Sequence, residues 1–329
     1  MAGMGKRMRP HTLTVPKPLI PIAGKPIVQR LVEELAAIST EPIEEVAYVV
    51  GRFGDEVEKN LIQIAERLGA KGTIHYQDEA LGTAHAVLCA RSALKGKVIV
   101  AFADTLFKAQ LELDPACDGV LWVQQLPNPE QFGVVKLSSD GFITDFIEKP
   151  KVFVSDLAMI GIYYFKEGEV LEGELQYLID NNIVKGGEYQ LPDALKNMTE
   201  KGKKFLPGKV DDWMDCGNKN ATVETNTRIL HYHANDPDLR AADTVLENSV
   251  IIAPSYIGKG VVLRNAIVGP HASIGDGCTV ESSIVRTTIV QENSIIKHSV
   301  IENAMLGKFV EYIGSPESLS IGDYSTKGK

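Results

Sequence analysis

The stretch that decides the fold lies at the start of the chain: Gly3-Met4-Gly5-Lys6-Arg7-Met8-Arg9-Pro10, followed by Pro16-Lys17-Pro18-Leu19-Ile20-Pro21. Two glycines separated by one residue let backbone N–H groups approach a bulky anion, and three basic side chains follow at once. Lys17 lies between two prolines, which restrict the backbone on both sides of it. A stiff segment that presents one lysine beside a glycine turn suits a triphosphate, although G-x-G alone equally describes a tight turn.

G-x-G-x-R followed by P-K-P-L-x-P is much more specific than either part. The combined pattern resembles the signature of the sugar-1-phosphate nucleotidyltransferases, G-G-x-G-x-R-[LM]-x-P and then P-K-P-L-[LIV]-P. The resemblance implies that an NTP reacts with a sugar 1-phosphate to give an NDP-sugar and pyrophosphate. A P-loop would need Ser or Thr after Gly5-Lys6, and Arg7 stands there instead.

Length and composition limit the class of protein. At 329 residues the chain is long enough for two domains, and 44% hydrophobic residues with 23% charged residues are ordinary for a globular protein. The net charge of −9 argues against a nucleic-acid polymer as partner. The four cysteines are scattered, as expected for reduced thiols, and no membrane span or signal peptide is recognisable. We therefore expect a cytoplasmic protein that does not bind a membrane.

The glycine turn begins early in the chain. In a parallel α/β domain a phosphate-binding turn follows a buried strand, and here only Met1 and Ala2 precede Gly3. The family resemblance also implies an apolar strand immediately upstream. We therefore expect Met1 to be an internal methionine, from a misassigned start or a shortened chain. If the upstream strand is missing, a central position in the sheet is empty.

Helical and extended patterns alternate along the first part of the chain. We predict strands at 46–50, 73–76, 98–103, 120–124, 133–137, 142–147 and 159–165. We predict helices at 26–37, 55–68, 83–93, 169–182, 191–202 and 218–234. This order predicts an α/β, Rossmann-like domain: a mixed, mainly parallel sheet with helices on both faces and ligands at the carboxyl ends of its strands.

The composition changes at about residue 245, where apolar residues begin to recur six apart. Imperfect copies of one hexapeptide, such as Ile257-Gly258-Lys259-Gly260 and Ile274-Gly275-Asp276-Gly277, are typical of a parallel β-helix. They resemble the left-handed kind, in which three hexapeptides make a coil of about 18 residues, so that residues 245–313 form three to four coils. Since such a stack needs caps or partners at its ends, we expect a homo-oligomer, with the β-helix as an oligomerisation or regulatory module.

We divide the chain accordingly into four parts. A nucleotidyltransferase domain is expected at 1–235, a linker at 236–244, a left-handed β-helix at 245–314 and a polar tail at 315–329.

The family resemblance assigns roles to the residues of the first motif. Arg7 is expected on the β- and γ-phosphates, because a guanidinium forks onto phosphate oxygens and keeps its charge. Lys17 is expected on the α-phosphate or the sugar phosphate, and Gly3 and Gly5 are expected to bring their backbones to the nucleotide. Outside this motif, Arg7 would be an ordinary solvated arginine.

A second motif runs Gln77-Asp78-Glu79-Ala80-Leu81-Gly82-Thr83-Ala84-His85-Ala86 and resembles the base-binding segment Q-x-x-x-x-G-T-[AG] of pyrimidine-using members. Gln77 can pair with an imide edge, and Gly82 leaves room for the base. Thr83 begins a helix, whose N-terminus attracts negative charge. From the residues alone, Thr83 could instead cap the helix, and we favour a packed or surface position for His85.

Two aspartates are expected to hold Mg²⁺. Asp104 ends the apolar run at 98–103 and matches the metal-binding aspartate of the family. Asp215 lies in Trp213-Met214-Asp215-Cys216-Gly217-Asn218, which resembles W-x-D-x-G-T with Asn218 in place of Thr. Mg²⁺ takes oxygen ligands and few protein groups. The alternative for Asp104 is that it caps the next turn.

Further matches predict the sugar site. Phe132-Gly133-Val134-Val135 and Phe146-Ile147-Glu148-Lys149-Pro150 resemble F-G-x-[VI] and [FL]-x-E-K-P. The resemblance implies that Gly133 contacts the sugar through its backbone, Glu148 accepts from sugar hydroxyls and Lys149 meets the sugar phosphate. Gly161 is expected to close the pocket, and Glu188 to lie near the sugar. The alternative for Glu148 and Lys149 is a surface ion pair.

These patterns predict a Mg²⁺-dependent sugar-1-phosphate nucleotidyltransferase that uses dTTP or UTP and glucose 1-phosphate. Met159 stands where some amino-sugar members carry Asn, which weakens the case for an N-acetylhexosamine. One alternative is a non-catalytic subunit that binds a nucleotide sugar and regulates a partner. Another is a bifunctional enzyme whose β-helix transfers an acyl group through His271 or His298, although corner or surface positions fit these histidines better.

Overall fold

The computed structural model describes residues 5–109, 117–315 and 317–326, and all structural statements refer to these residues. Contacts divide the chain into two compact units, described one at a time below. The first comprises Met1–Ile20 and Lys25–Asn218, and the second comprises Pro21–Gly24 and Lys219–Lys329. The boundaries predicted from the sequence, at 235, 244 and 314, stay predictions.

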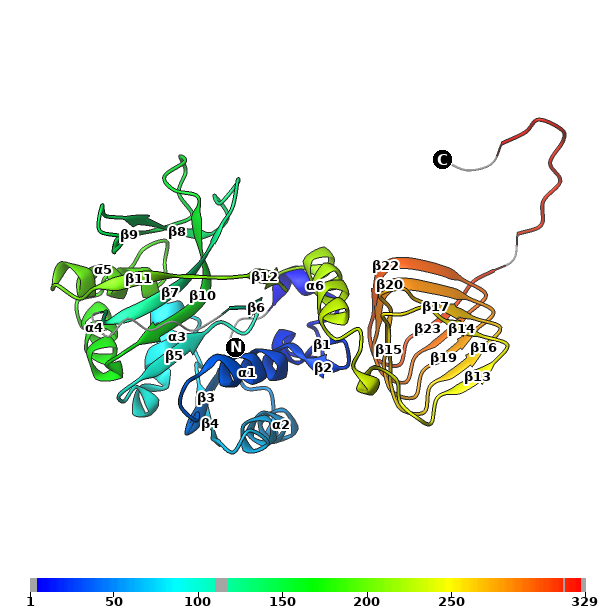
Figure 1. Ribbon diagram of the computed structural model, residues 1–329, viewed down its shortest axis with the longest axis horizontal. Coiled ribbons are helices and arrows are strands. Elements are labelled where there is room, and N and C mark those ends of the chain that lie inside the picture. Colours follow the sequence, from blue (N-terminus) through cyan, green and yellow to red (C-terminus); the bar gives the residue numbers. More distant parts are fainter. Residues whose placement is uncertain (1–4, 110–116, 316, 327–329) are drawn as a thin grey trace. The chain divides into compact units, whose positions relative to one another are not determined.

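The first unit is built on a six-stranded mixed sheet (Figure 1). Its strands are ordered β11 (Phe205–Lys209), β7 (Gly119–Gln125), β10 (Leu157–Phe165), β8 (Gly133–Leu137) and β9 (Ile143–Glu148), and β5 (Val98–Ala101) also pairs with β10. Three helices share one core with this sheet: α3 (Thr83–Cys89), α4 (Gly168–Asp180) and α5 (Leu191–Glu200). Each helix turns a row of apolar side chains, mostly Leu and Ala, toward the sheet.

A second core of this unit lies between two helices and a parallel pair of strands. The helices are α1 (Ile27–Ile38) and α2 (Asp55–Glu66), and the strands are β3 (Glu45–Val50) and β4 (Lys71–Tyr76). The remaining elements as far as Asn218 are short: η1 (Lys6–Met8), η2 (Lys17–Leu19), β1 (Pro21–Ile22), β2 (Lys25–Pro26), η3 (Arg91–Ala93), β6 (Thr105–Lys108) and β12 (Asp212–Asp215). None of the helices in the described ranges is long and apolar enough to cross a membrane.

The predicted Rossmann-like fold with a mixed sheet is confirmed. Parallel pairs are fewer than expected. β5, β7 and β8 all pair antiparallel with β10, and β9 pairs antiparallel with β8. β5, expected to be buried, is half-buried. Within the described residues, β5 pairs with β10 alone and β3 pairs with β4 alone, so each keeps one edge open. The strand expected before Gly3 stays a prediction.

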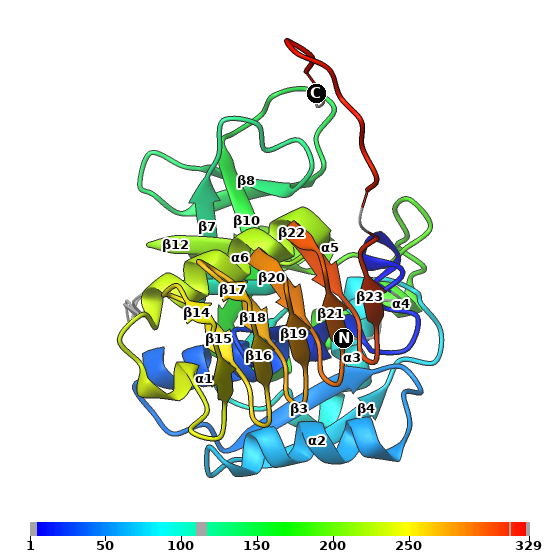
Figure 2. The same ribbon diagram turned by 90° about the vertical axis from the view of Figure 1, so that its right-hand side faces the viewer.

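The second unit contains a parallel β-helix whose strands stack in register (Figure 2). One sheet holds β13 (Val245–Glu247), β16 (Val262–Arg264), β19 (Thr279–Glu281), β21 (Ile295–Lys297) and β23 (Glu311–Ile313). The other holds β14 (Val250–Ile251), β15 (Tyr256–Ile257), β17 (Ile267–Val268), β18 (Ser273–Ile274), β20 (Ile284–Val290) and β22 (Val300–Leu306). The long strands β20 and β22 each run along two sides of a coil, since β20 pairs with both β17 and β18.

Strand pairing gives the length of each coil. Five inward residues stack in register, one from each strand of the first sheet: Leu246, Leu263, Val280, Ile296 and Tyr312. The chain thus advances by seventeen positions over each of the first two coils and by sixteen over each of the last two. The stack therefore has about four coils and agrees with the predicted left-handed β-helix, but each coil is shorter than the expected three full hexapeptides. The strands keep their register, so the missing residues are lost at the corners. The inward side chains between the ends are fully buried, as at Leu263, Val280 and Ile296.

Helix α6 (Lys219–Tyr232) packs against β20 and β22 of this unit. Its Asn226 is fully buried and satisfies three partners. The Oδ1 atom accepts from the backbone N–H of Ala23 at 2.9 Å and from Ser273 Oγ at 2.7 Å, and Nδ2 donates to the His271 carbonyl at 3.3 Å. One side chain thus joins the helix, the segment 21–24 and the β-helix.

We expect Asn226→Ala to lower the free energy of unfolding by about 1–3 kcal/mol, because it leaves buried polar groups without partners. Urea unfolding of the full chain followed by circular dichroism measures this change. Asn220→Ala is the matched control, since Asn220 lies on the same helix and is exposed. Equal stability of the two variants would contradict the role given to Asn226.

Candidate active site

The glycine turn of the first motif packs against the lysine loop. Gly5 has φ +54°, and a Cβ there would lie 3.0 Å from Thr12 Cγ2 and 3.2 Å from Lys17 Cβ. The Thr12 hydroxyl donates to the Gly5 carbonyl at 2.8 Å. A larger residue would therefore force the turn away from Lys17. Arg7 is exposed within η1, while Gly3 lies outside the described residues.

Lys17 forms an ion pair with Asp104, and this pair connects two of the predicted motifs. Lys17 begins η2 between its two prolines, and only 10% of its side chain is exposed. Its Nζ lies 2.9 Å from Asp104 Oδ2. The Asp104 side chain is 42% exposed, so the pair lies at the surface of the unit, where a ligand can reach it.

Asp104 and Asp215 are brought together by two short strands that the sequence does not predict. β6 and β12 pair antiparallel, with Thr105 opposite Asp215, and the Cys216 N–H donates to the Asp104 carbonyl at 3.0 Å. Burial raises the pKa of Asp215, and the negative charge of Asp104 raises it further. A hydrogen bond from the Gly217 N–H and the charges of Lys17 and Arg7 oppose this increase in pKa. Arg7, Lys17, Asp104 and Asp215 therefore form one charged cluster.

The two carboxylates fit a hard divalent cation. Both supply oxygen ligands, and their mutual repulsion would be relieved by a cation between them. Within the described ranges, no group of three or more His, Cys, Asp or Glu side chains is placed to bind a metal. Mg²⁺ is suited to such a sparse set, because it keeps waters and takes phosphate oxygens from its substrate.

The second motif forms a compact turn in which Gln77 has a defined orientation. Gln77 follows β4, and its Nε2 donates to the Gly82 carbonyl at 3.0 Å and lies 3.1 Å from His85 Nδ1. On the other side of the imidazole, Nε2 lies 4.0 Å from Cys89 Sγ. Because Gln77 Nε2 can only donate, His85 Nδ1 is the acceptor and carries no proton. The Gln77 Oε1 atom is then the part of the amide that can accept from a ligand.

Gly82 allows this turn to approach the segment that carries Glu188. It has φ +110°, and a Cβ there would lie 2.4 Å from the Tyr189 carbonyl oxygen. Thr83 Oγ1 accepts from the Leu191 N–H at 3.0 Å, so its hydroxyl links α3 to the start of α5. Glu188 itself is exposed next to this contact.

The predicted sugar residues lie close together on β8 and β9. Gly133 is paired with Glu148, and a Cβ at Gly133 would lie 2.7 Å from Glu148 Oε2. Lys149 Nζ lies 3.4 Å from Glu148 Oε1. The Gly161 carbonyl accepts from the Phe102 N–H at 2.9 Å, at a bulge in β10. The structure therefore places the side chains of Glu148 and Met159 against the face of Gly133, with Met159 Cε 2.5 Å from where a Cβ would lie.

Two residues beside the predicted site residues are not among them. Tyr163 is buried, and burial together with the charge of Glu148 raises its pKa. Its position within an apolar strand gives no local signal of a charged neighbour. His85, for which we favoured a packed or surface position, is half-buried and contacts Gln77 through Nδ1. Its place in the second motif is the signal that points to this contact.

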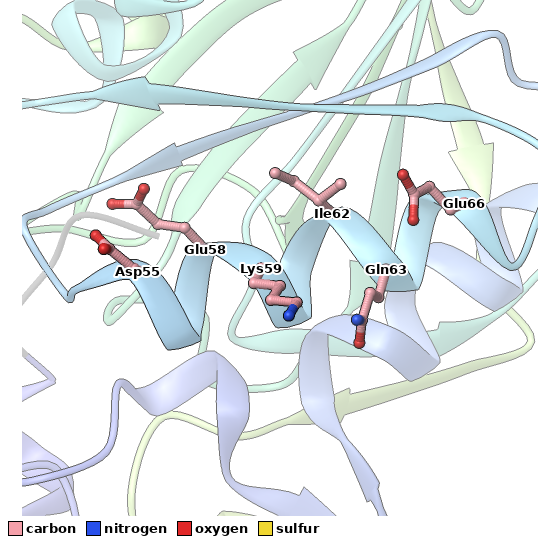
Figure 3. A pocket seen from close by; sticks show the side chains of 6 residues that line it. All are labelled: Asp55, Glu58, Lys59, Ile62, Gln63 and Glu66. Carbon is pink, nitrogen blue, oxygen red and sulfur yellow. The ribbon is translucent and has the colours of Figure 1, made fainter.

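A surface pocket of this unit lies elsewhere. It is lined by six residues that all belong to α2: Asp55, Glu58, Lys59, Ile62, Gln63 and Glu66 (Figure 3). None of them is a predicted site residue, and one face of a helix cannot surround a substrate. The charged cluster and the turn at Gln77 are therefore better candidates for the active site.

Comparisons with known proteins identify the family of the chain. Residues 1–231 match the family model described as nucleotidyl transferase. The glucose-1-phosphate thymidylyltransferase of Streptomyces griseus is 30% identical over 352 residues, which covers 98% of this chain and 96% of that protein. The bifunctional protein GlmU of Methanococcus maripaludis is 30% identical over 332 residues, which covers 95% of this chain and 74% of that protein.

A solved structure supports the fold independently. UDP-glucose pyrophosphorylase complexed with UDP-glucose aligns with a TM-score of 0.56 at 23% identity, covering 70% of this chain and 96% of that chain. The resemblance drawn from the motifs is thus confirmed. The chain belongs to the nucleotidyl transferase family and is a sugar-phosphate nucleotidyltransferase enzyme.

Proposed function

We propose that this enzyme transfers a nucleotidyl group from dTTP or UTP to glucose 1-phosphate. The observation that carries the proposal is the charged cluster, in which Lys17 contacts Asp104 beside the half-buried Asp215, within reach of the charge of Arg7. Such a cluster offers cations for phosphate groups and oxygen ligands for a divalent metal within one site. Members of the family generally use a divalent metal, and we propose Mg²⁺.

The reaction requires positioning and charge neutralisation more than a strong base, because the attacking group is already an oxyanion. An oxygen of the sugar phosphate bonds to the α-phosphorus, and the bond to the bridging oxygen of pyrophosphate breaks. Arg7 holds the β- and γ-phosphates and stays charged as pyrophosphate leaves. Lys17 exchanges Asp104 for a phosphate oxygen. Asp104 and Asp215 would hold Mg²⁺, which when bound supplies positive charge at the α-phosphate.

The orientation of Gln77 supports the choice of nucleotide. Its Nε2 is occupied by Gly82 and His85, so Oε1 accepts from the ligand. The imide N–H of uracil or thymine can donate to this oxygen. Cytosine presents an acceptor at the same position and is disfavoured. The name of the Streptomyces griseus relative agrees with dTTP.

Glu148 and Gly133 are proposed for the sugar hydroxyls, and Lys149 for the sugar phosphate. Gly5, Gly82 and Thr83 are proposed near the nucleotide, with Gly161 and Glu188 at the edge of the sugar. These roles rest on the positions described above and on the family motifs.

A cytoplasmic location and a homo-oligomer are also proposed. The four cysteines are all thiols, as in a reducing compartment. One side of the β-helix carries a ladder of aliphatic residues that face outward in register: Val250, Ile267, Ile284 and Val300. Three of them are exposed, which suits contact with a second copy.

Pyrophosphate release in the presence of Mg²⁺ tests the proposed reaction. The enzyme is assayed with dTTP, UTP, GTP, ATP and CTP, each against a panel of sugar 1-phosphates. We expect release with dTTP or UTP and glucose 1-phosphate, and a loss of at least about 100-fold in Lys17→Met, which removes the ammonium that meets phosphate. Release with another pair would correct the substrates, and wild-type activity in Lys17→Met would refute the role of the cluster.

The pKa of Asp215 predicts an effect on stability that depends on pH. Because folding raises this pKa, the favourable contribution of the group is present below its unfolded pKa and is lost as the pH rises through its folded pKa. Asp215→Asn cannot ionise, so its stability does not fall as the pH rises, and it keeps the oxygen that accepts from the Gly217 N–H. We therefore expect the metal-free variant to be more stable than the parent at pH 7 and the difference to shrink at acidic pH.

Urea unfolding in the presence of a chelator, repeated between pH 4 and pH 8, measures this effect. Asp211→Asn, at an exposed position nearby, is the control and should change little. A variant Asp215→Asn that is less stable than the parent at pH 7 would contradict the prediction.

His85 is expected to position Gln77 and so to affect the choice of base. His85→Leu removes the acceptor at Nδ1, and we expect the ratio of kcat/KM for UTP over CTP to fall about fivefold, the effect of one hydrogen bond. His85→Asn returns an acceptor oxygen near the place of Nδ1 and should restore most of the ratio. Steady-state kinetics with both nucleotides measures it, and an unchanged ratio in His85→Leu would exclude the positioning role.

A further inference from the structure

The tail after the last coil contains a copy of an inner part of the β-helix. Ser320-Ile321-Gly322-Asp323 repeats Ser273-Ile274-Gly275-Asp276 residue by residue. The coil that precedes Ser273-Ile274-Gly275-Asp276 carries Ile257-Gly258-Lys259 at the same place in the repeat. The last coil carries Leu306-Gly307-Lys308 at that place. The tail sequence is therefore preceded by an apolar-Gly-Lys segment, as the inner sequence is.

The spacing of the tail agrees with this repeat. On this side of the β-helix, the inward residues of successive coils are Ile257, Ile274, Val290 and Leu306, so the first step is seventeen positions and the next two are sixteen. Ile321 follows Leu306 after a step of fifteen. From the end of β21 at Lys297 to Leu306 the chain takes nine residues, and from the end of β23 at Ile313 to Ile321 it takes eight. The chain can therefore reach its own last coil, with one more residue lost at a corner.

The backbone of the tail already has the conformation of a coil corner. The residue three after each inward residue has a positive φ: +64° at Gly260, +67° at Gly277, +57° at Asn293 and +55° at Phe309. Tyr324, three residues after Ile321, has φ +61°. A positive φ is uncommon for a bulky side chain, so its recurrence at this position is informative.

Both the last coil and the tail expose apolar side chains. Tyr312 occupies the inward position that is fully buried at Ile296, yet it is 51% exposed, and Phe309 is 72% exposed. Ile321 of the tail is 51% exposed. In Figure 1 the tail, drawn in red, runs away from the last coil. An open end with unpaired strand edges is the part of a solenoid that requires a cap.

We propose that residues 319–324 form the next side of this chain's own β-helix and cap its open end. Ser320 and Ile321 pair in parallel with Met305 and Leu306, as Ser273 and Ile274 pair with Tyr256 and Ile257. Ile321 covers Leu306, and Tyr324 lies over Phe309.

A side-chain hydrogen bond completes the match between the tail and the inner copy. Asp276 Oδ1 accepts from the backbone N–H of Lys259 at 2.9 Å. The corresponding residues at the open end are Asp323 and Lys308, so the Asp323 carboxylate accepts from the Lys308 N–H. The chain itself is the occupant of this end, because its tail carries the sequence, the length and the corner conformation that the end requires.

Hydrogen exchange of the full chain, followed by mass spectrometry, tests whether the tail docks. We expect amides in peptides covering 303–310 and 319–326 to exchange about tenfold or more slowly in the parent than in Ile321→Asp. Ser318→Asp, which adds the same charge just outside the docked segment, is the matched control and should exchange like the parent. A tail that exchanges at the rate of an unstructured peptide in the parent would refute the proposal.

A disulfide between Met305→Cys and Ser320→Cys tests which chain supplies the tail. Neighbouring residues on paired strands lie close enough for such a bond. After mild oxidation we expect a crosslink within one chain, detected by peptide mapping and absent from the parent and from each single variant. A crosslink between two chains, or none, would overturn the assignment to the same chain.

Discussion

The ion pair between Lys17 and Asp104 is the contact on which the charged cluster depends. It joins the amino-terminal lysine loop to the loop after β5, although these residues are 87 positions apart. Lys17 is nearly buried, so its ammonium needs a negative partner, and Asp104 supplies it. Under the proposed function, the pair would keep a cation for phosphate and a carboxylate for a divalent metal side by side. Substrate binding would then exchange one set of ionic contacts for another.

Two glycines each let separate segments of the first unit approach more closely than a side chain would permit. Gly82 brings the turn that holds Gln77 against the segment at Tyr189. Gly133 leaves room for the side chains of Glu148 and Met159. At Gly82 a Cβ would lie 2.4 Å from the backbone carbonyl oxygen of Tyr189, so the backbone itself requires the space, whereas at Gly133 the nearest atoms are the ends of two side chains.

The second unit is held together differently, by short strands that stack in register. Its inward aliphatic residues bury one coil against the next, and Asn226 satisfies the polar groups where α6 and the segment 21–24 join the stack. Each coil of a solenoid contacts only its neighbours, so the coils at the two ends need caps. The repeat within the tail supports the proposal that the tail caps the carboxyl-terminal end.

The sequence by itself determined the family, the Rossmann-like domain, the β-helix and the motifs that carry the candidate site. Phosphate and metal chemistry restrict residue types over short stretches, and a stacked coil requires an apolar residue at every inward position, so both leave local patterns. Tertiary structure alone decided that β6 and β12 place Asp104 beside Asp215, that His85 holds Gln77, and that α6 packs on the β-helix. Each of these depends on contacts between residues distant in the chain. No local spacing or composition encodes which distant strands or side chains will meet.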